Sequence, residues 1–319
     1  MKRIVPAAAL LAALTGCDDQ INADSVQNLN LTKPLEFKVF EFNTPMTEGG
    51  STTGGFTPTG MPSAETHYCV LSRVAGDFQG FGEVVRLSND GGQWSLTGQS
   101  GQATGVSAKA TCVPKYSFAM KDDKKAKLIA ANVGSPEGFA SSNCQTQSSP
   151  VAGAAGKALF VSGIRGRYSG GGEGLAVGDP GAGMQGLVVF NGCSNGAGGW
   201  ATSYVLRPDG KTLRYFGPAG PTSDFVAATF GTSIGTPPPD PWYHSSLQTW
   251  GTAPTTITLA PVNQAVCGII AISGKFRGSG EFVEVLPEGG SWVLRIGNLQ
   301  PSDGFVLGAA RCVLRDQRG

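Results

Sequence analysis

Short apolar runs alternate with glycine-rich and proline-rich turns along most of the chain, and one such pattern occurs three times. The three copies span residues 74–87, 164–177 and 272–286 and read VAGDFQGFGEVVRL, IRGRYSGGGEGLAV and ISGKFRGSGEFVEVL. Each copy has glycine, an aromatic residue and glycine at alternate places, then a third glycine and a closing glutamate. Because alternate side chains of a strand share one face, the ring and its flanking glycines lie together and the variable polar residues face the other way. The pattern predicts a strand and a glycine-rich bend in each of three related units.

The residues after each bend extend the repeat. The segments EVVRL and EFVEV have strand composition, and the turn signals SNDGGQW and PEGGSW follow them. Trp94, Met184 and Trp292 each stand eleven residues after the closing glutamate of their copy. We therefore expect an all-β protein in which each unit is an antiparallel meander of four strands. The spacing leaves open whether the three units pack side by side, as in a sandwich, or around a pseudo-threefold axis.

Composition supports this fold class, because 48 glycines and 20 prolines with only 15% charged residues favour short strands and turns over long helices. The middle copy departs from the others, since Leu159 stands where the other two have a cysteine. The expected organisation is a signal peptide over 1–16, a lipidated flexible tether over 17–57, and β units over 58–120, 121–210 and 211–319.

The first seventeen residues, MKRIVPAAALLAALTGC, combine a basic start, an apolar run and small residues before a cysteine. The segment Leu14-Thr15-Gly16-Cys17 resembles the lipobox of bacterial lipoproteins. That resemblance implies cleavage by signal peptidase II before Cys17 and attachment of several acyl chains to it, which anchor a protein stably. The alternative is an ordinary secretory signal with a chance cysteine. No later apolar run approaches the ~20 residues that a membrane-spanning helix needs.

Charge refines the expected location and excludes one class of partner. Removal of the signal peptide leaves 22 basic residues against 23 acidic ones, a net charge of −1, whereas nucleic-acid-binding proteins show a basic excess. In enterobacterial lipoproteins, acidic residues after the lipidated cysteine, here Asp18-Asp19, imply retention on the periplasmic side of the inner membrane. The outer membrane is the alternative.

Six cysteines remain after Cys17, and the repeat predicts how they pair in an oxidising compartment. Cys69 and Cys267 each lie seven residues before the first glycine of their copy, and the strings TCVP and RCVL follow the same two copies. We predict three disulfides, Cys69–Cys112, Cys267–Cys312 and, by elimination, Cys144–Cys193. Each closes a loop worth about 4 kcal/mol in the chain-entropy model. Without a CxxC motif, and with only His67 and His244 as imidazole ligands, we expect no metal site.

Catalysis has little support in the sequence. Metalloprotease, serine-hydrolase, Walker and dinucleotide motifs do not occur, so we expect neither an enzyme nor a cofactor. The closing glutamates, Glu83, Glu173 and Glu281, have equivalent positions and so are not opposed across one substrate. Each glutamate has two interpretations. It caps backbone amides of the glycine bend, or it forms one shallow polar site per unit for sugar hydroxyls or a cation.

The aromatic residues divide into two groups. We expect the repeated rings, Phe78, Tyr168 and Phe276, to pack in the core together with the tryptophans of the repeat. Trp242, Tyr243 and His244 follow a proline cluster and are a candidate contact patch. The expected function is an envelope-bound, adhesin-like module that recognises a glycan or an envelope protein, where several weak sites gain strength together. The alternative is a structural or assembly lipoprotein without a small ligand.

Overall fold

The computed structural model describes residues 35–44, 55, 57–89, 92–120, 133–134, 146–150, 157–181, 184–191, 198–205, 244–249, 255–298 and 306–317. These residues form three antiparallel sheets and one short parallel strand pair, with a 3-10 turn at Lys115–Ser117, which confirms the all-β class. Within the described ranges there is no α-helix, and so none that is long and apolar enough to cross a membrane. The signal peptide, Cys17, Cys144, Cys193, Trp242 and Tyr243 lie outside the described residues.

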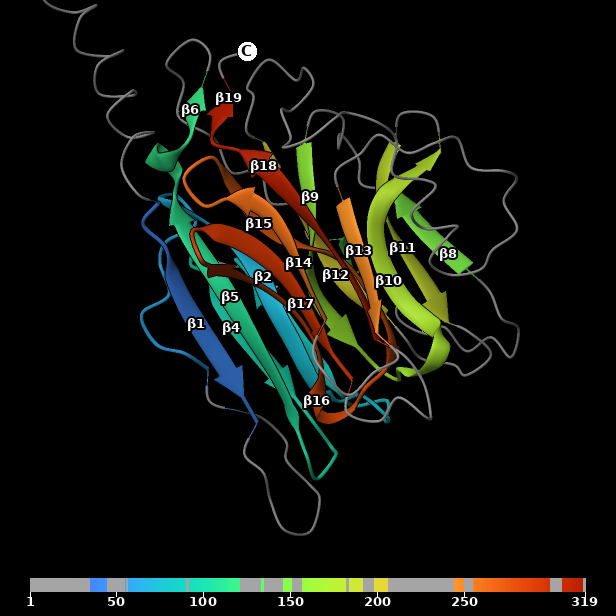
Figure 1. Cartoon of the computed structure of the whole chain (residues 1–319). Coiled ribbons are helices and arrows are strands. Elements are labelled where there is room, and N and C mark those ends of the chain that lie inside the picture. Colours follow the sequence, from blue (N-terminus) through green and yellow to red (C-terminus); the bar gives the residue numbers. More distant parts are fainter. Residues whose placement is uncertain are drawn as a thin grey trace, which may run out of the picture.

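Twelve strands follow the repeat, four per unit (Figure 1). The first unit holds β2 (His67–Asp77), β3 (Val84–Ser88), β4 (Ser95–Gln99) and β5 (Val106–Pro114). The second unit holds β9 (Lys157–Arg165), β10 (Ser169–Gly181), β11 (Met184–Asn191) and β12 (Gly198–Val205). The third unit holds β15 (Ala265–Lys275), β16 (Arg277–Glu288), β17 (Ser291–Gly297) and β18 (Val306–Leu314). The flanking strands are β1 (Lys38–Asn43), β6 (Ala119–Met120), β7 (Val133–Gly134), β8 (Thr146–Pro150), β13 (His244–Thr249), β14 (Thr255–Pro261) and β19 (Asp316–Gln317).

The pairing of these strands is cyclic. In every unit the first strand pairs with the last, as β2 does with β5, β9 with β12 and β15 with β18. The middle hairpin joins the next unit instead, so that β3 pairs with β9, β10 with β15 and β16 with β2. The sheet orders are therefore β1-β5-β2-β16-β17-β14, β4-β3-β9-β12-β7 and β13-β18-β15-β10-β11-β8. This arrangement corrects the expected meander, because the first and second strands of a unit belong to different sheets.

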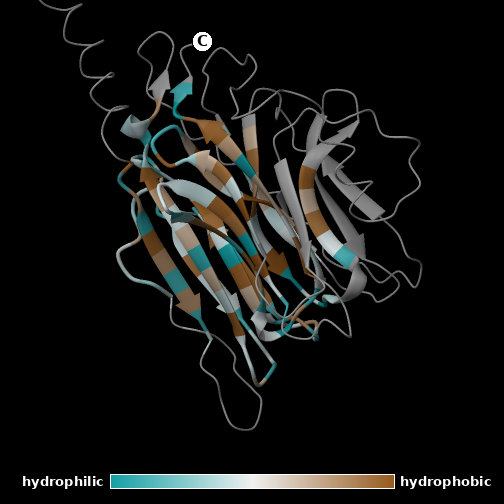
Figure 2. Ribbon diagram, in the orientation of Figure 1, coloured by the Kyte–Doolittle hydropathy of each residue, from teal (hydrophilic) through white to brown (hydrophobic). Residues whose placement is uncertain are grey.

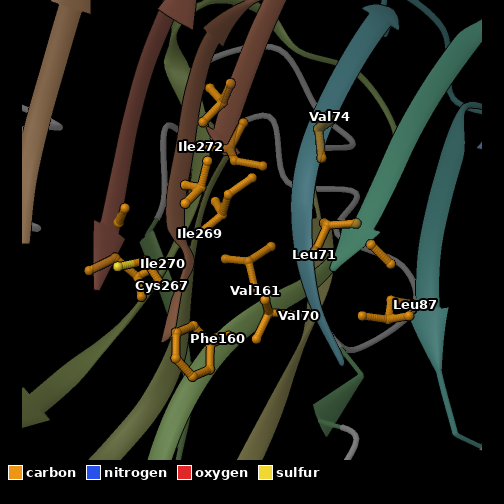
Figure 3. Packing of buried hydrophobic residues seen from close by; sticks show 14 of the residues in the cluster. Val70, Leu71, Val74, Leu87, Phe160, Val161, Cys267, Ile269, Ile270 and Ile272 are labelled. Carbon is orange, nitrogen blue, oxygen red and sulfur yellow. The ribbon is translucent and has the colours of Figure 1, made fainter. Parts of the chain in front are cut away.

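The core lies where the three first strands meet. β15 is buried along almost its whole length, and β2 nearly so, as expected for strands covered on both faces. Figure 3 shows side chains from β2, β9 and β15 packed together, among them Val70, Phe160 and Ile269. One contiguous cluster of buried apolar residues extends through all three sheets.

β1 lies in a stretch that the sequence analysis assigned to the tether. Lys38–Asn43 pair with β5 as an outer strand, and Phe42 is fully buried against the core. Figure 2 shows that hydrophobic and hydrophilic residues alternate along this strand. Its sequence, KVFEFN, is short and is followed by a glycine-rich stretch. The described chain thus enters the fold well before residue 57.

Two disulfides confirm the predicted cysteine pairing in the first and third units. Cys69–Cys112 and Cys267–Cys312 each join directly opposed residues of a first and a last strand. In the middle unit the equivalent cross-strand pair is Leu159 and Ser203. We call the end of the molecule that carries these pairs the disulfide end, and the opposite end, where the glycine bends lie, the bend end. Disulfides of this kind indicate an extracytoplasmic location.

Candidate functional site

The three repeated aromatic side chains meet at the bend end. Phe78, Tyr168 and Phe276 are fully buried, which confirms that they pack in the core. Each ring contacts the other two edge to face, with centroid separations of 6.0, 6.1 and 6.1 Å and interplanar angles of 73°, 83° and 85°. Such contacts add about 0.5–1.5 kcal/mol per pair beyond simple burial. The aromatic position of the repeat therefore joins the three units at one point.

The backbone of the same three residues forms a closed ring of hydrogen bonds. The amide of Phe78 donates to the carbonyl of Phe276 at 2.9 Å, and the amide of Phe276 donates to the carbonyl of Tyr168 at 3.0 Å. The amide of Tyr168 completes the ring by donating to Phe78 at 2.6 Å. The side-chain amide of Gln79 covers the ring, donating to the carbonyls of Tyr168 at 2.8 Å and Phe276 at 2.7 Å. Residues nearly 200 positions apart in the sequence are thus held at one centre.

The first glycine of each copy makes the approach to this centre possible. Gly76, Gly166 and Gly274 have φ angles of 124°, 84° and 117°, a region that other residues rarely adopt. At Gly76 a Cβ atom would also lie 2.5 Å from the Cα atom of Val106. These glycines are required by the backbone and are not evidence of a phosphate-binding loop.

The rest of the motif forms a bulge where the chain crosses between sheets. In β16, Gly278 pairs with Gly76 but Phe282 pairs with Ala75, so the three residues of β16 between them have no paired residue on β2. The register of β10 shifts in the same way between Gly170 and Gly174. In these two copies the closing glutamate, Glu281 or Glu173, is the last residue of the bulge, and the same two strands pair again after it.

The three glutamates are buried in this bulge, with exposed fractions of 1% for Glu83 and 3% each for Glu173 and Glu281. One oxygen of Glu83 accepts a hydrogen bond from the backbone amide of Gly101 at 3.2 Å. The carboxylate lies against the bend, since a Cβ atom on Gly80 would be 2.6 Å from Oε2 of Glu83. Burial favours the capping interpretation over an open site, although the capped amide belongs to the loop after β4 and not to the bend itself.

Titratable groups gather close to the three aromatic rings. Burial raises the pKa of Tyr168 well above its ordinary value, and the nearby carboxylate of Glu173 raises it further. Asp77 accepts hydrogen bonds from the amide of Gln79 and the hydroxyl of Thr104, both at 3.1 Å.

The environment of Asp77 is acidic. Burial raises the pKa of Asp77, hydrogen bonds from Thr104 and Gln79 oppose the rise, and the carboxylates of Glu83 and Glu281 add to it. The other two copies carry Arg167 and Lys275 at this position. Across the described residues, no group of three or more histidine, cysteine or acidic side chains is arranged to hold a metal ion.

Two residues of this region were missed by the sequence analysis. Phe81 is 65% exposed in the first glycine bend, between Gly80 and Gly82. Arg167 lies across from this bend, between the amides that donate to Glu83 and Phe78, and its buried Nε atom has no hydrogen-bond partner among the described residues. A signal for Phe81 was present, because Gly171 and Ser279 occupy the same place in the other copies. Both residues stand at variable positions of the repeat, and the strand alternation does not predict which variable positions are exposed.

The remaining predicted contact residue is separate from this centre. His244 is the first residue of β13, where its backbone pairs with that of Arg311 at the edge of the β15 sheet. It does not adjoin the glycine bends in sequence or in strand pairing. His244 and the glycine bends therefore lie at two different places on the molecule.

Comparison with known proteins adds no family to this description, because no protein-family model and no curated protein matches the chain.

Proposed function

We propose that this protein is a lipid-anchored binding module of the bacterial cell envelope and that its contact surface is the bend end around Phe81. The observation that carries the proposal is the exposure of Phe81, 65%, on a rigidly built bend. Exposed aromatic side chains are enriched at recognition surfaces, whereas buried ones serve packing. The partner is a glycan or another envelope protein.

The position of Phe81 relative to the anchor supports this assignment. The described chain enters beside the disulfide end, where Lys38 pairs with Cys112, and β1 ends beside the bend end, where Asn43 pairs with Ser107 (Figure 1). The eleven residues of β2 separate the two ends by about 35 Å. If Cys17 carries the lipid, the segment up to Leu35 reaches at most about 60 Å from the membrane. The bend end, which lies opposite the point where the described chain enters, can then reach partners beyond the membrane surface.

The second candidate is a structural or assembly lipoprotein. The observation that favours it is the burial of all three glutamates, which leaves none of these repeated carboxylates open to a small ligand. Such a protein would contact its partner over a broad surface. Exposed Tyr116 and Val39, both near the disulfide end, are available for a contact of that kind.

A site-specific crosslink in living cells tests the proposal. A photoreactive phenylalanine analogue placed at Phe81 is expected to give an adduct, because this side chain contacts the partner. The same analogue at Tyr116, which is 52% exposed at the disulfide end, is the matched control. Adducts from position 116 alone would favour the assembly role and refute the bend end as the contact surface.

The anchor requires a separate test. Inhibition of signal peptidase II is expected to leave the unprocessed precursor, because cleavage before Cys17 depends on that enzyme. Normal processing in the presence of the inhibitor would overturn the lipid anchor while leaving the crosslinking result at Phe81 unaffected.

A further inference from the structure

The ring of Phe81 is open to solvent on the first bend. The side chain is 65% exposed, and Gly80 and Gly82 on either side have no side chain that would cover it. The other two copies of the repeat have Gly171 and Ser279 at this position, so the ring is a feature of the first copy alone. The face of an aromatic ring carries partial negative charge and attracts cations. The exposed ring therefore favours a cationic group over an anionic one.

A buried carboxylate lies beneath the same bend. Glu83 is 1% exposed, and its Oε1 atom accepts a hydrogen bond from the amide of Gly101. Among the described residues its Oε2 atom has no hydrogen-bond partner, and no basic side chain forms an ion pair with it. A buried charge without an ionic partner is costly, and an opposite charge nearby offsets that cost.

The geometry keeps this carboxylate close to Phe81. A Cβ atom on Gly80 would lie 2.6 Å from Oε2 of Glu83. Since consecutive Cα atoms are about 3.8 Å apart, Oε2 lies within about 8 Å of the Cα atom of Phe81. The Debye length in physiological salt is also about 8 Å, and salt screens buried charges less than exposed ones. The carboxylate is enclosed and touches no ligand, but its field reaches the solvent around the ring.

Other charges at the bend end have both signs. Burial raises the pKa of Asp77, and the carboxylates of Glu83 and Glu281 raise it further, so these negative charges act on one another. Two arginines oppose the negative field. Arg277 pairs with Asp77 across β16 and β2, and Arg167 lies across from the first bend. Because Glu83 is buried beneath the bend without an ion pair, its charge dominates at Phe81.

From these observations we propose that the first bend binds a basic side chain of a partner protein, with an arginine guanidinium or a lysine ammonium over the ring of Phe81 and within the field of Glu83. The inference rests on the proposed function and names the chemistry of the partner at that surface. Small ligands bind mostly in concave sites, whereas Phe81 lies open on the surface. A protein partner therefore suits this ring better than a free cation does.

The apolar cavity at the disulfide end does not compete for this role. It has a volume of about 20 Å³, and the side chains that line it include Tyr68, Phe160 and Val313. A space of this size holds about one water molecule, and its apolar lining offers no counter-charge to a cation.

The test titrates the full chain, purified in detergent, with N-acetylarginine amide and with its neutral isostere N-acetylcitrulline amide. A para-fluorinated phenylalanine at position 81 reports binding by fluorine NMR. We expect the arginine probe to shift this signal with an affinity in the millimolar range, and the citrulline probe to bind about threefold or more weakly. A trifluorinated phenylalanine at the same position keeps the size of the ring but withdraws charge from its face, so it should weaken arginine binding about twofold or more.

Three substitutions test the field of the buried carboxylate. Glu83→Gln keeps the size of the side chain and removes its charge, so it should weaken arginine binding about twofold or more. Glu173→Gln is the matched control, because this carboxylate is also buried but belongs to the middle copy, which has Gly171 in place of the ring. It should change binding less than Glu83→Gln does. Arg167→Gln removes an opposing charge and should strengthen binding.

The outcomes separate this inference from the proposed function. Equal binding of the two probes, or arginine binding that trifluorination and Glu83→Gln both leave unchanged, overturns the basic side chain. If neither probe shifts the signal but the photoreactive analogue at Phe81 gives a discrete adduct in cells, the basic side chain is wrong and the contact surface stands. If that analogue gives no adduct and neither probe binds, both fail. Thermal melting of each variant verifies that a change in binding does not reflect unfolding.

Discussion

Replacement of Phe276 by alanine tests whether the aromatic centre joins the three units. The side chain is fully buried, and its ring contacts those of Phe78 and Tyr168 at 6.1 Å each. Removing a buried phenylalanine costs about 3–5 kcal/mol through lost burial and the cavity that remains. The two lost ring contacts, at about 0.5–1.5 kcal/mol each, bring the expected loss to about 4–8 kcal/mol. That loss is a large part of the 5–15 kcal/mol that is typical of a folded domain.

The assay is urea unfolding of the oxidised protein, followed by tryptophan fluorescence, since Trp94 and Trp292 are both buried. Phe282→Ala is the control, because this ring is only partly buried and stacks with Arg73 at 4.9 Å. Its expected cost is below about 2 kcal/mol. A loss below about 2 kcal/mol for Phe276→Ala would show that the three bends are not joined through their rings.

The double variant with Phe78→Ala provides a further test of the same reasoning. Residues in direct contact show interaction energies of about 0.5–3 kcal/mol, so the two substitutions should not be additive. Additive losses would mean that the rings of Phe78 and Phe276 stabilise the units separately. An interaction energy near zero between the two substitutions would refute a shared aromatic centre.

Three further predictions concern the backbone, the charges and the cross-links. Gly76→Ala should lower the melting temperature more than Gly289→Ala, because both have positive φ but only at Gly76 would the new atom meet a neighbour within 4 Å. The pKa of the Asp77 carboxyl is higher in the folded protein than in the unfolded chain. The stability that this group contributes is therefore fully present below the unfolded pKa and is lost as the pH rises through the folded pKa. Asp77→Asn should therefore weaken that decline and be at least as stable as the parent at pH 7 in urea titrations, and a steeper decline would contradict the cause. Peptide mapping without reduction should recover a Cys144–Cys193 pair, and either cysteine found free or joined elsewhere would refute that prediction.

Local spacing determined much of this protein without tertiary information. Alternation of apolar residues and turn signals places the twelve strands of the repeat, because side-chain period and turn chemistry act over a few residues. The position of Cys69 and Cys267 relative to the repeat predicts their pairing, since equivalent strands present equivalent partners. The repeat also identifies the aromatic position as core, because one ring per unit flanked by glycines suits a shared interior.

Tertiary structure alone decided which strands become neighbours. The alternation of the β3–β4 hairpin does not specify its neighbour, and in the structure β3 pairs with β9 of the next unit. That crossing buries Glu83 and leaves Phe81 exposed, although the two residues are two positions apart in the same motif. The glutamates at the end of each bend stand out in the sequence because they repeat, and the structure buries all three. The exposure of Phe81 depends on how the three sheets pair with one another, which no local pattern specifies.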